Sequence, residues 1–270
     1  MSSRVGERID HALVARGLAR SRAVAQELIA QGQARCDGKV VTKPSAKVAA
    51  DSTLEIVGEI DPWVGRAAHK LLGALDAFTA VDPRGLRAID VGASTGGFTQ
   101  VLLERGATSV EAVDVGHGQL AAPIAVDPRV RDHSGMTVRG IDPGVIGGTS
   151  PLVVTDLSFI SLTLVMADLA RLMTDNADLI ALVKPQFEVG RERLGHSGVV
   201  RSPRERERAL RAVIASATAA DLHVHGLDRS VVTGTEGNQE YLLWARRSPV
   251  GKMAEAAIDH FIATIDQEDT

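Results

Sequence analysis

The sequence predicts an α/β protein in which a mainly parallel sheet, covered by helices on both faces, follows a small α+β module. From Arg87 onward, apolar runs of strand length alternate with segments of helical periodicity, a pattern typical of parallel sheets. A glycine-rich segment follows the first of these strands, where such sheets bind ligands. Before about residue 60 the pattern is different, with two short helices followed by a hairpin.

Length and composition fit a soluble globular protein with a small and a large domain. The 270 residues are 44% hydrophobic and 24% charged, enough to bury a core and unlike a disordered chain. The one cysteine, Cys36, excludes an internal disulfide and a cysteine-built zinc site, and we expect no metal. The N-terminus lacks an apolar signal core, and no run approaches the roughly 20 apolar residues of a membrane span. We therefore expect a cytoplasmic protein with no membrane partner. The sequence leaves its oligomeric state open, a monomer included.

Charge is distributed unevenly along the chain. The net charge is −4, yet residues 1–47 hold nine Lys and Arg against four Asp and Glu, a local balance of +5. This excess predicts a phosphate-binding surface. A solvated helix face with a chance excess of charge is the alternative.

Local signals define the elements of the first module. Apolar residues at helical spacing predict a helix that ends at Gly17, and Ser21 is placed to cap a second helix that Gly32 stops. Asp37-Gly38 lies between short strand-like runs and predicts a tight hairpin, because both residues tolerate positive φ. Residues 54–57 supply another strand.

Proline and glycine mark a boundary between two domains. Residues 61–65 contain both, and no periodicity crosses them, which is typical of a linker. We expect one domain over residues 1–60 and a second over 66–270. Trp63, inside the linker, is expected to pack against one of them.

The second domain is expected to alternate strands and helices. The segments concerned are 87–91, 98–104, 110–115, 152–156, 162–173, 179–183, 204–219, 224–232 and 241–245.

The glycine-rich segment predicts a nucleoside cofactor. Its glycines let the backbone approach a ligand, and the helix that it opens offers unpaired N–H groups. Asp114 follows at about the spacing at which an acid binds ribose hydroxyls. NAD is the alternative, but Ser94 replaces the second glycine of the dinucleotide pattern, so we expect S-adenosylmethionine ahead of NAD. The candidate cofactor-binding residues are Asp90, Gly92, Ala93, Ser94, Thr95, Gly96, Gly97, Phe98 and Asp114.

Three charged residues border later strands of the predicted sheet. Asp156 ends one strand, Lys184 ends the next before Pro185 turns the chain out of the sheet, and Glu240 precedes the last strand. Taken singly, each fits an ordinary strand-end charge as well as a catalytic group.

The first module resembles the S-four RNA-binding module in Arg20-Ser21-Arg22 and in residues 37–44. The resemblance covers about 50 residues. In that family a helix pair grips structured RNA by its backbone, and such contacts position RNA without reading its sequence. An exposed charge in water is the alternative for each basic residue. The implied phosphate contacts are Arg4, Arg16, Arg20, Arg22, Lys39, Lys43 and Lys47.

Six motifs of the second domain resemble, in order, those of the TlyA (haemolysin A) family of ribosomal RNA 2′-O-methyltransferases, related to the RrmJ/FtsJ enzymes. The resemblance implies a Rossmann-like class I methyltransferase domain, S-adenosylmethionine as the cofactor, and ribosomal RNA in ribosomal subunits as the partner. It adds Arg66 as an RNA contact. The motifs are Arg66–Leu71, Asp90–Thr99, Asp114–Leu120, Asp156–Ser161, Val183–Gly190 and Gly237–Tyr241.

The resemblance also implies a catalytic tetrad of Lys70, Asp156, Lys184 and Glu240. We expect Lys184 to be the general base, because partial burial beside a second ammonium favours a neutral amine. Asp156 would orient Lys184, while Lys70 and Glu240 would hold the ribose and balance charge. Two lysines and two acids form a net-neutral group that can be desolvated.

The chain departs from the family pattern most clearly over residues 134–139. Family members carry an acidic residue there that could bind the cofactor's adenine, whereas this chain has Ser134. Asp132 is the nearby acid and the remaining candidate. Gly65-Arg66-Ala67 and His117 are smaller departures.

Two other classes of function stay open. A ribosome-assembly factor could keep the fold and bind RNA without catalysis, and the family's historical name suggests a membrane-lysing haemolysin. Loss of the tetrad would favour the first, but all four residues are present. The second needs an apolar span or a strongly amphipathic basic segment, and the sequence has neither.

Overall fold

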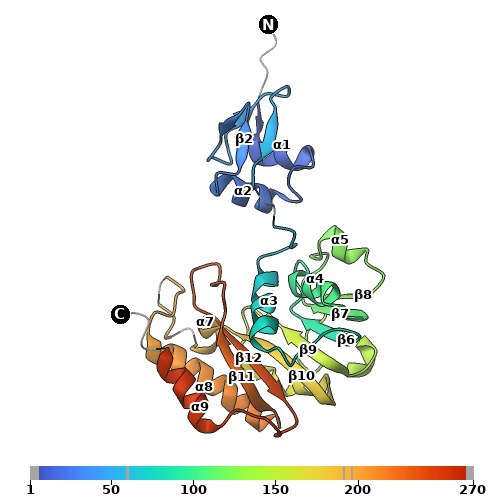
Figure 1. Ribbon diagram of the computed structural model, residues 1–270, viewed down its shortest axis with the longest axis vertical. Helices are drawn as coiled ribbons and strands as arrows, with labels where there is room; N and C mark the ends of the chain where they lie inside the picture. The colour runs from blue at the N-terminus through green and yellow to red at the C-terminus, as the bar shows by residue number, and fades with distance from the viewer. Residues whose placement is uncertain (1–5, 59–60, 191, 196, 266–270) are drawn as a thin grey trace. The chain divides into compact units, whose positions relative to one another are not determined.

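In the computed structural model the chain divides into two compact units between Pro62 and Trp63 (Figure 1). The structure describes residues 6–58, 61–190, 192–195 and 197–265. The division falls inside the segment 61–65 that is expected to be a linker. Trp63 packs against a core of the second unit, and the backbone N–H of Val64 donates to Gln100 Oε1 at 2.7 Å.

The first unit is a small α+β module, as expected. β2 pairs antiparallel with β3 and β5, and β1 pairs with β4 in a separate two-stranded sheet. Its elements are β1 (Glu7–Arg8), α1 (Ile9–Ala15), α2 (Arg22–Ala30), β2 (Ala34–Cys36), β3 (Lys39–Val40), β4 (Lys47–Val48) and β5 (Leu54–Ile56).

The local signals of this module act as the sequence predicts. Ser21 Oγ accepts a hydrogen bond from Val24 N at the start of α2. Asp37 and Gly38 adopt φ values of +50° and +75° in the turn between β2 and β3, a conformation that hairpins of this kind require. Apolar side chains of both helices, among them Leu13, form the core with residues from the strands.

The second unit contains the remaining elements. They are α3 (Ala67–Ala77), β6 (Arg87–Val91), α4 (Gly97–Glu104), β7 (Ser109–Asp114), α5 (Ala122–Ala125), β8 (Val130–Ser134), η1 (Pro143–Ile146), β9 (Ser150–Thr155), η2 (Leu162–Leu164), α6 (Met166–Arg171), β10 (Met173–Val183), α7 (Pro185–Glu188), α8 (Pro203–Ala219), β11 (His223–Arg229), β12 (Tyr241–Arg246) and α9 (Glu255–Thr264).

A seven-stranded sheet with the order β11-β12-β10-β9-β6-β7-β8 forms the centre of this unit. Its strands run parallel except around β12, which is antiparallel to both neighbours. Alternate residues enter two cores, so that Ile89 packs with α6, α8 and α9 while Ala88 packs with α3 and α4. Helices therefore cover both faces of a mainly parallel sheet (Figure 1), which confirms the predicted fold class.

Some boundaries differ from the sequence-based expectation. The helix expected over 162–173 is divided into η2 and α6, because Val165 between them has φ −125° and ψ 0°. β10 begins at Met173 rather than at 179, and its register with β9 shifts before Asp178. β8 was not expected, since its sequence Val-Arg-Asp-His-Ser lacks an apolar run, and it lies at the exposed edge of the sheet.

In the part of the chain that the structure describes, no helix combines the length and the apolar character needed to cross a membrane.

Candidate functional site

The sheet topology explains why distant charged residues meet. β9 and β10 are parallel neighbours, so Asp156 and Lys184, which follow them, lie at the same edge of the sheet. β12 is antiparallel to β10, with Tyr241 opposite Val183, and the residue before β12 therefore returns to this edge. That residue is Glu240. Ligands of parallel sheets bind at this edge.

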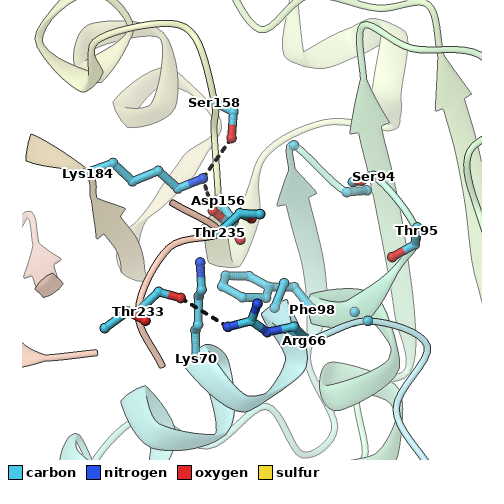
Figure 2. A pocket seen from close by; sticks show the side chains of 15 residues that line it. Arg66, Lys70, Ser94, Thr95, Phe98, Asp156, Ser158, Lys184, Thr233 and Thr235 are labelled. Atoms are coloured by element: carbon cyan, nitrogen blue, oxygen red, sulfur yellow. Dashed lines mark hydrogen bonds and ion pairs between the residues drawn. The ribbon is translucent and has the colours of Figure 1, made fainter. Parts of the chain in front are cut away.

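Lys184 is held by two groups from the segment after β9. Its Nζ lies 2.6 Å from Asp156 Oδ1 and donates to Ser158 Oγ at 2.8 Å (Figure 2). The Lys184 residue is only 6% exposed, and Asp156 is partly buried. Asp156 thus contacts Lys184 directly, as the orienting role expected for it requires.

Lys70 forms a second ion pair with Glu240. Lys70 lies in the first turns of α3, and its Nζ contacts Glu240 Oε2 at 2.6 Å. Both residues are buried, with Glu240 only 1% exposed. Gln186 Nε2 donates to the other carboxylate oxygen at 3.3 Å. The two lysines are therefore each neutralised by a different acid.

These pairs border a cavity of about 230 Å³. Lys70, Asp156 and Lys184 line it, together with residues of the glycine-rich segment, whereas Glu240 lies outside its lining. Figure 2 shows Lys70 and Arg66, both on the α3 side, opposite Lys184. The backbone of Gly92 and the side chain of Phe98 complete this part of the wall.

A second cavity of about 530 Å³ adjoins the first. Gly92, Ser94, Asp156 and Ser158 line both cavities, so the two share a wall. Asp114 lines only the larger one, beside apolar side chains. A polar cleft with lysines thus lies beside a larger compartment of ordinary ligand size.

The glycine-rich segment forms the shared wall by close backbone packing. Gly92 has φ +87°, and a Cβ there would lie 2.8 Å from the carbonyl oxygen of Asp156. Any side chain at this position would collide with the backbone of the Asp156 segment. Asp114 fixes the other side of the loop, since its carboxylate accepts from Ser94 N at 2.8 Å and from Gly116 N at 2.7 Å.

Asp90 lies beneath this loop and is completely buried. Its Oδ2 accepts from Thr99 Oγ1 at 2.6 Å, while Oδ1 has no hydrogen-bond partner among the described residues. Burial raises the pKa of Asp90 to about 7, and the negative charges of Asp156 and Asp114 add to this increase. The Asp90 carboxyl group can therefore change its protonation state near neutral pH, although Asp90 lines neither cavity.

The segment expected to contact a cofactor base contributes apolar contacts instead of an acid. Met136 and Val138 line the larger cavity, with Thr137 between them. Asp132 lines neither cavity, and its Oδ1 accepts from the backbone N–H and the hydroxyl of Ser134. A direct role for Asp132 stays a prediction.

The basic residues predicted to bind RNA fall into two groups. Lys39, Lys43 and Lys47 are exposed, and Arg66 is exposed at the rim of the smaller cavity, where it donates to Thr233 O at 3.4 Å. The arginines of the first unit, by contrast, make internal contacts. Arg16 donates to the carbonyl groups of Ala49, Ala50 and Ser52, Arg20 donates to that of Asp61, and Arg22 pairs with Asp10 at 2.9 Å. Arg4 lies outside the described residues.

Asp10 is a buried centre of charge that the sequence reasoning did not identify. Its carboxylate accepts from Arg8, Arg22 and Gln26, and it is fully buried. The hydrogen bonds from Arg8 hold the pKa of Asp10 well below its usual range. Two guanidinium groups are thereby fixed side by side on the first unit.

Ser158, Thr233 and Thr235 also line the smaller cavity without having been predicted. Ser158 lies two residues after Asp156, within a motif already singled out, so its hydroxyl could have been identified from spacing. The two threonines belong to the loop before Glu240, where no periodic pattern indicates which side chains face the cleft.

Known proteins resemble this chain over most of its length. The model of the FtsJ-like methyltransferase family matches residues 63–247, and that of the S4 domain matches residues 7–54. The 16S/23S rRNA (cytidine-2′-O)-methyltransferase TlyA of Mycobacterium tuberculosis is 49% identical over 240 residues, covering 88% of this chain and 89% of that protein. Hemolysin A of Brachyspira hyodysenteriae is 32% identical, over 87% of this chain and 98% of its own. The solved structure "Putative hemolysin from Streptococcus thermophilus" matches with a TM-score of 0.76 and 35% identity, over 98% of both chains.

Proposed function

The chain belongs to the FtsJ-like methyltransferase family and to its TlyA group, and on this premise we propose that it methylates a ribose 2′-hydroxyl of ribosomal RNA through Lys70, Asp156, Lys184 and Glu240. One observation carries the proposal. Two buried lysine–carboxylate pairs meet at the edge of the sheet where the glycine-rich segment shapes a cavity.

The cofactor is S-adenosylmethionine, which supplies a methyl group on a positively charged sulfur. The residues present fit this molecule. Gly92 lets the loop pack directly against the backbone of Asp156 and so shapes the wall that both cavities share, and the unpaired Oδ1 of Asp90 is a buried acceptor beneath the loop. The carboxylate of Asp114 in the larger cavity suits ribose hydroxyls, and the apolar Met136 and Val138 suit a base.

Lys184 serves as the general base. A ribose hydroxyl is a poor nucleophile near neutral pH, so its proton must pass to a group beside it as the new oxygen–carbon bond forms. Lys184 must first release its own proton to solvent, and its neutral Nζ then accepts the proton of the hydroxyl, while Asp156 and Ser158 hold the amine at 2.6 and 2.8 Å. Lys70, held by Glu240, binds the ribose and supplies positive charge at the cleft.

Ribosomal RNA is the substrate class that best fits both units. The first unit matches the S4 domain and exposes Lys39 and Lys43, which suit phosphate groups. The Mycobacterium tuberculosis relative is named as a cytidine-2′-O-methyltransferase of 16S and 23S ribosomal RNA. We extend this substrate to the present chain, with the RNA presented in a ribosomal subunit.

The test is methylation of purified ribosomal subunits with methyl-labelled S-adenosylmethionine. We expect the label in ribosomal RNA, at a ribose whose 3′ linkage becomes resistant to alkaline hydrolysis. Label on a base would contradict the assignment of the hydroxyl. No label in either subunit or in free RNA would favour a non-catalytic assembly factor instead.

A further inference from the structure

Lys184 directly precedes the short helix α7 and Glu188 is its last residue, and both hold the segment that follows β9. Lys184 contacts the start of that segment at Asp156 and Ser158. Glu188 contacts its end, where the carboxylate accepts from Ser161 Oγ at 2.5 Å and from the backbone N–H of Leu162 at 2.9 Å. One short element therefore fixes both ends of residues 156–162.

Glu188 lies where it can position the segment after β9, but not where it can touch a substrate in either cavity. It lines neither cavity, and it is partly buried. Burial raises its pKa, and the hydrogen bonds from Ser161 and from the amides of Leu162 and Thr163 oppose that increase. Leu162 and Thr163 belong to the first turn of η2 and Ser161 is its N-cap residue, so the carboxylate lies where a helix leaves N–H groups without partners.

The segment between the two contacts is strained and needs support. Phe159 has φ +65°, an unfavourable conformation for a residue with a bulky side chain, and the residue is 91% exposed. The ring is 5.2 Å from that of Phe187, again on α7. Without the bonds from Glu188, residues 157–161 can relax, and Ser158 then leaves Lys184.

We propose that Glu188 is a positioning residue that sets the place of Asp156 and Ser158 against Lys184. This inference rests on the proposed function, because it concerns the same methyl transfer. A displacement of the order of 1 Å in a reacting group can lower a rate about 100-fold. The role needs acceptor geometry and not charge, since a glutamine can accept from Leu162 N and donate to Ser161 Oγ.

The test compares Glu188→Ala with Glu188→Gln in the full-length protein. We expect Glu188→Ala to lower kcat for RNA methylation by about 10- to 100-fold, and Glu188→Gln to stay within about threefold of the wild type. Glu104→Gln, an exposed glutamate of α4 remote from both cavities, is the matched control and should leave kcat unchanged. Amide hydrogen exchange should be faster at Leu162 in Glu188→Ala alone.

Ser161→Ala provides a milder variant in case Glu188→Ala unfolds. It should lower kcat less than Glu188→Ala does. The double variant should be no slower than Glu188→Ala, because both substitutions remove the same contact between Ser161 and Glu188. Equal losses in Glu188→Ala and Glu188→Gln, or an unchanged kcat in Ser161→Ala and Glu188→Ala, would overturn the positioning role. A wild type without methylation would instead refute the proposed function. Hydrogen exchange at Leu162 would then still test the contact itself.

Discussion

Lys70 and Glu240 are 170 positions apart in the chain, yet their side chains form a buried ion pair at 2.6 Å. The pair joins α3, which precedes the sheet, to the start of β12, which is its last strand in the sequence. It therefore joins the first helix of the second unit to the last strand of its sheet beside the cleft.

Replacing Lys70 by methionine should destabilise the protein, because Glu240 would keep a buried charge without its partner. We expect a loss of about 3–5 kcal/mol in the free energy of unfolding, measured by urea denaturation at pH 7. Lys70→Met combined with Glu240→Gln should lose less than the sum of the single changes. The control is Arg105→Met, which breaks an exposed pair with Asp76 and should change stability by less than about 1 kcal/mol. Equal effects of Lys70→Met and Arg105→Met would contradict a buried, coupled pair.

Asp90 should make stability depend on pH. Its pKa of about 7 in the folded protein lies above the value of about 3.9 in an unfolded chain. Between these values the folded state binds more protons than the unfolded state, so stability should fall as pH rises from about 4 to about 7. Unfolding free energies of the wild type and Asp90→Asn, compared at pH 5 and pH 8, test this. Asp90→Asn should reduce the decline in unfolding free energy between pH 5 and pH 8, whereas Asp175→Asn, at an exposed position, should leave that decline unchanged.

S-adenosylmethionine binding should also follow the ionisation of Asp90. A carboxylate attracts the cationic cofactor better than a neutral carboxyl group, so the Kd should decrease as pH rises through about 7. Titration calorimetry of the wild type and Asp90→Asn across this range would show it. The same pH profile in both proteins would mean that another group governs binding.

Lys39 and Arg16 should behave differently in RNA binding, although the sequence suggested the same role for both. Lys39→Ala removes an exposed cation. It should reduce the slope of log K for RNA binding against log salt concentration by about one, without changing stability. Arg16→Ala should lower the free energy of unfolding by about 1–2 kcal/mol, because its guanidinium holds the backbone of residues 49–52. RNA titrations at several salt concentrations, together with thermal unfolding, separate the two. An unchanged unfolding free energy in Arg16→Ala would refute the structural role.

Patterns of local origin could be predicted from the sequence. The alternation of strands and helices predicted the fold class, and Asp37-Gly38 predicted the hairpin, because strands, helices and tight turns depend on neighbouring residues. The motif around Asp156 and Lys184 gave residues that the structure brings into contact.

Pairings over long distances could not be predicted in the same way. No sequence spacing indicates that Arg22 would bind Asp10, or that Glu188 would hold Ser161, because both contacts depend on how helices pack. β8 could not be predicted from the sequence for a different reason. An edge strand buries little apolar surface, so the hydrophobic pattern that identifies inner strands is missing.

The rate of RNA methylation by Lys184→Ala tests the central claim most directly. Wild-type and variant proteins would be saturated with S-adenosylmethionine and ribosomal RNA, with binding of both confirmed separately, and the first turnover followed. A general base contributes about 10²- to 10⁴-fold, so the variant should be slower by at least about 100-fold while binding is unchanged. Full methyl transfer by Lys184→Ala would contradict the account.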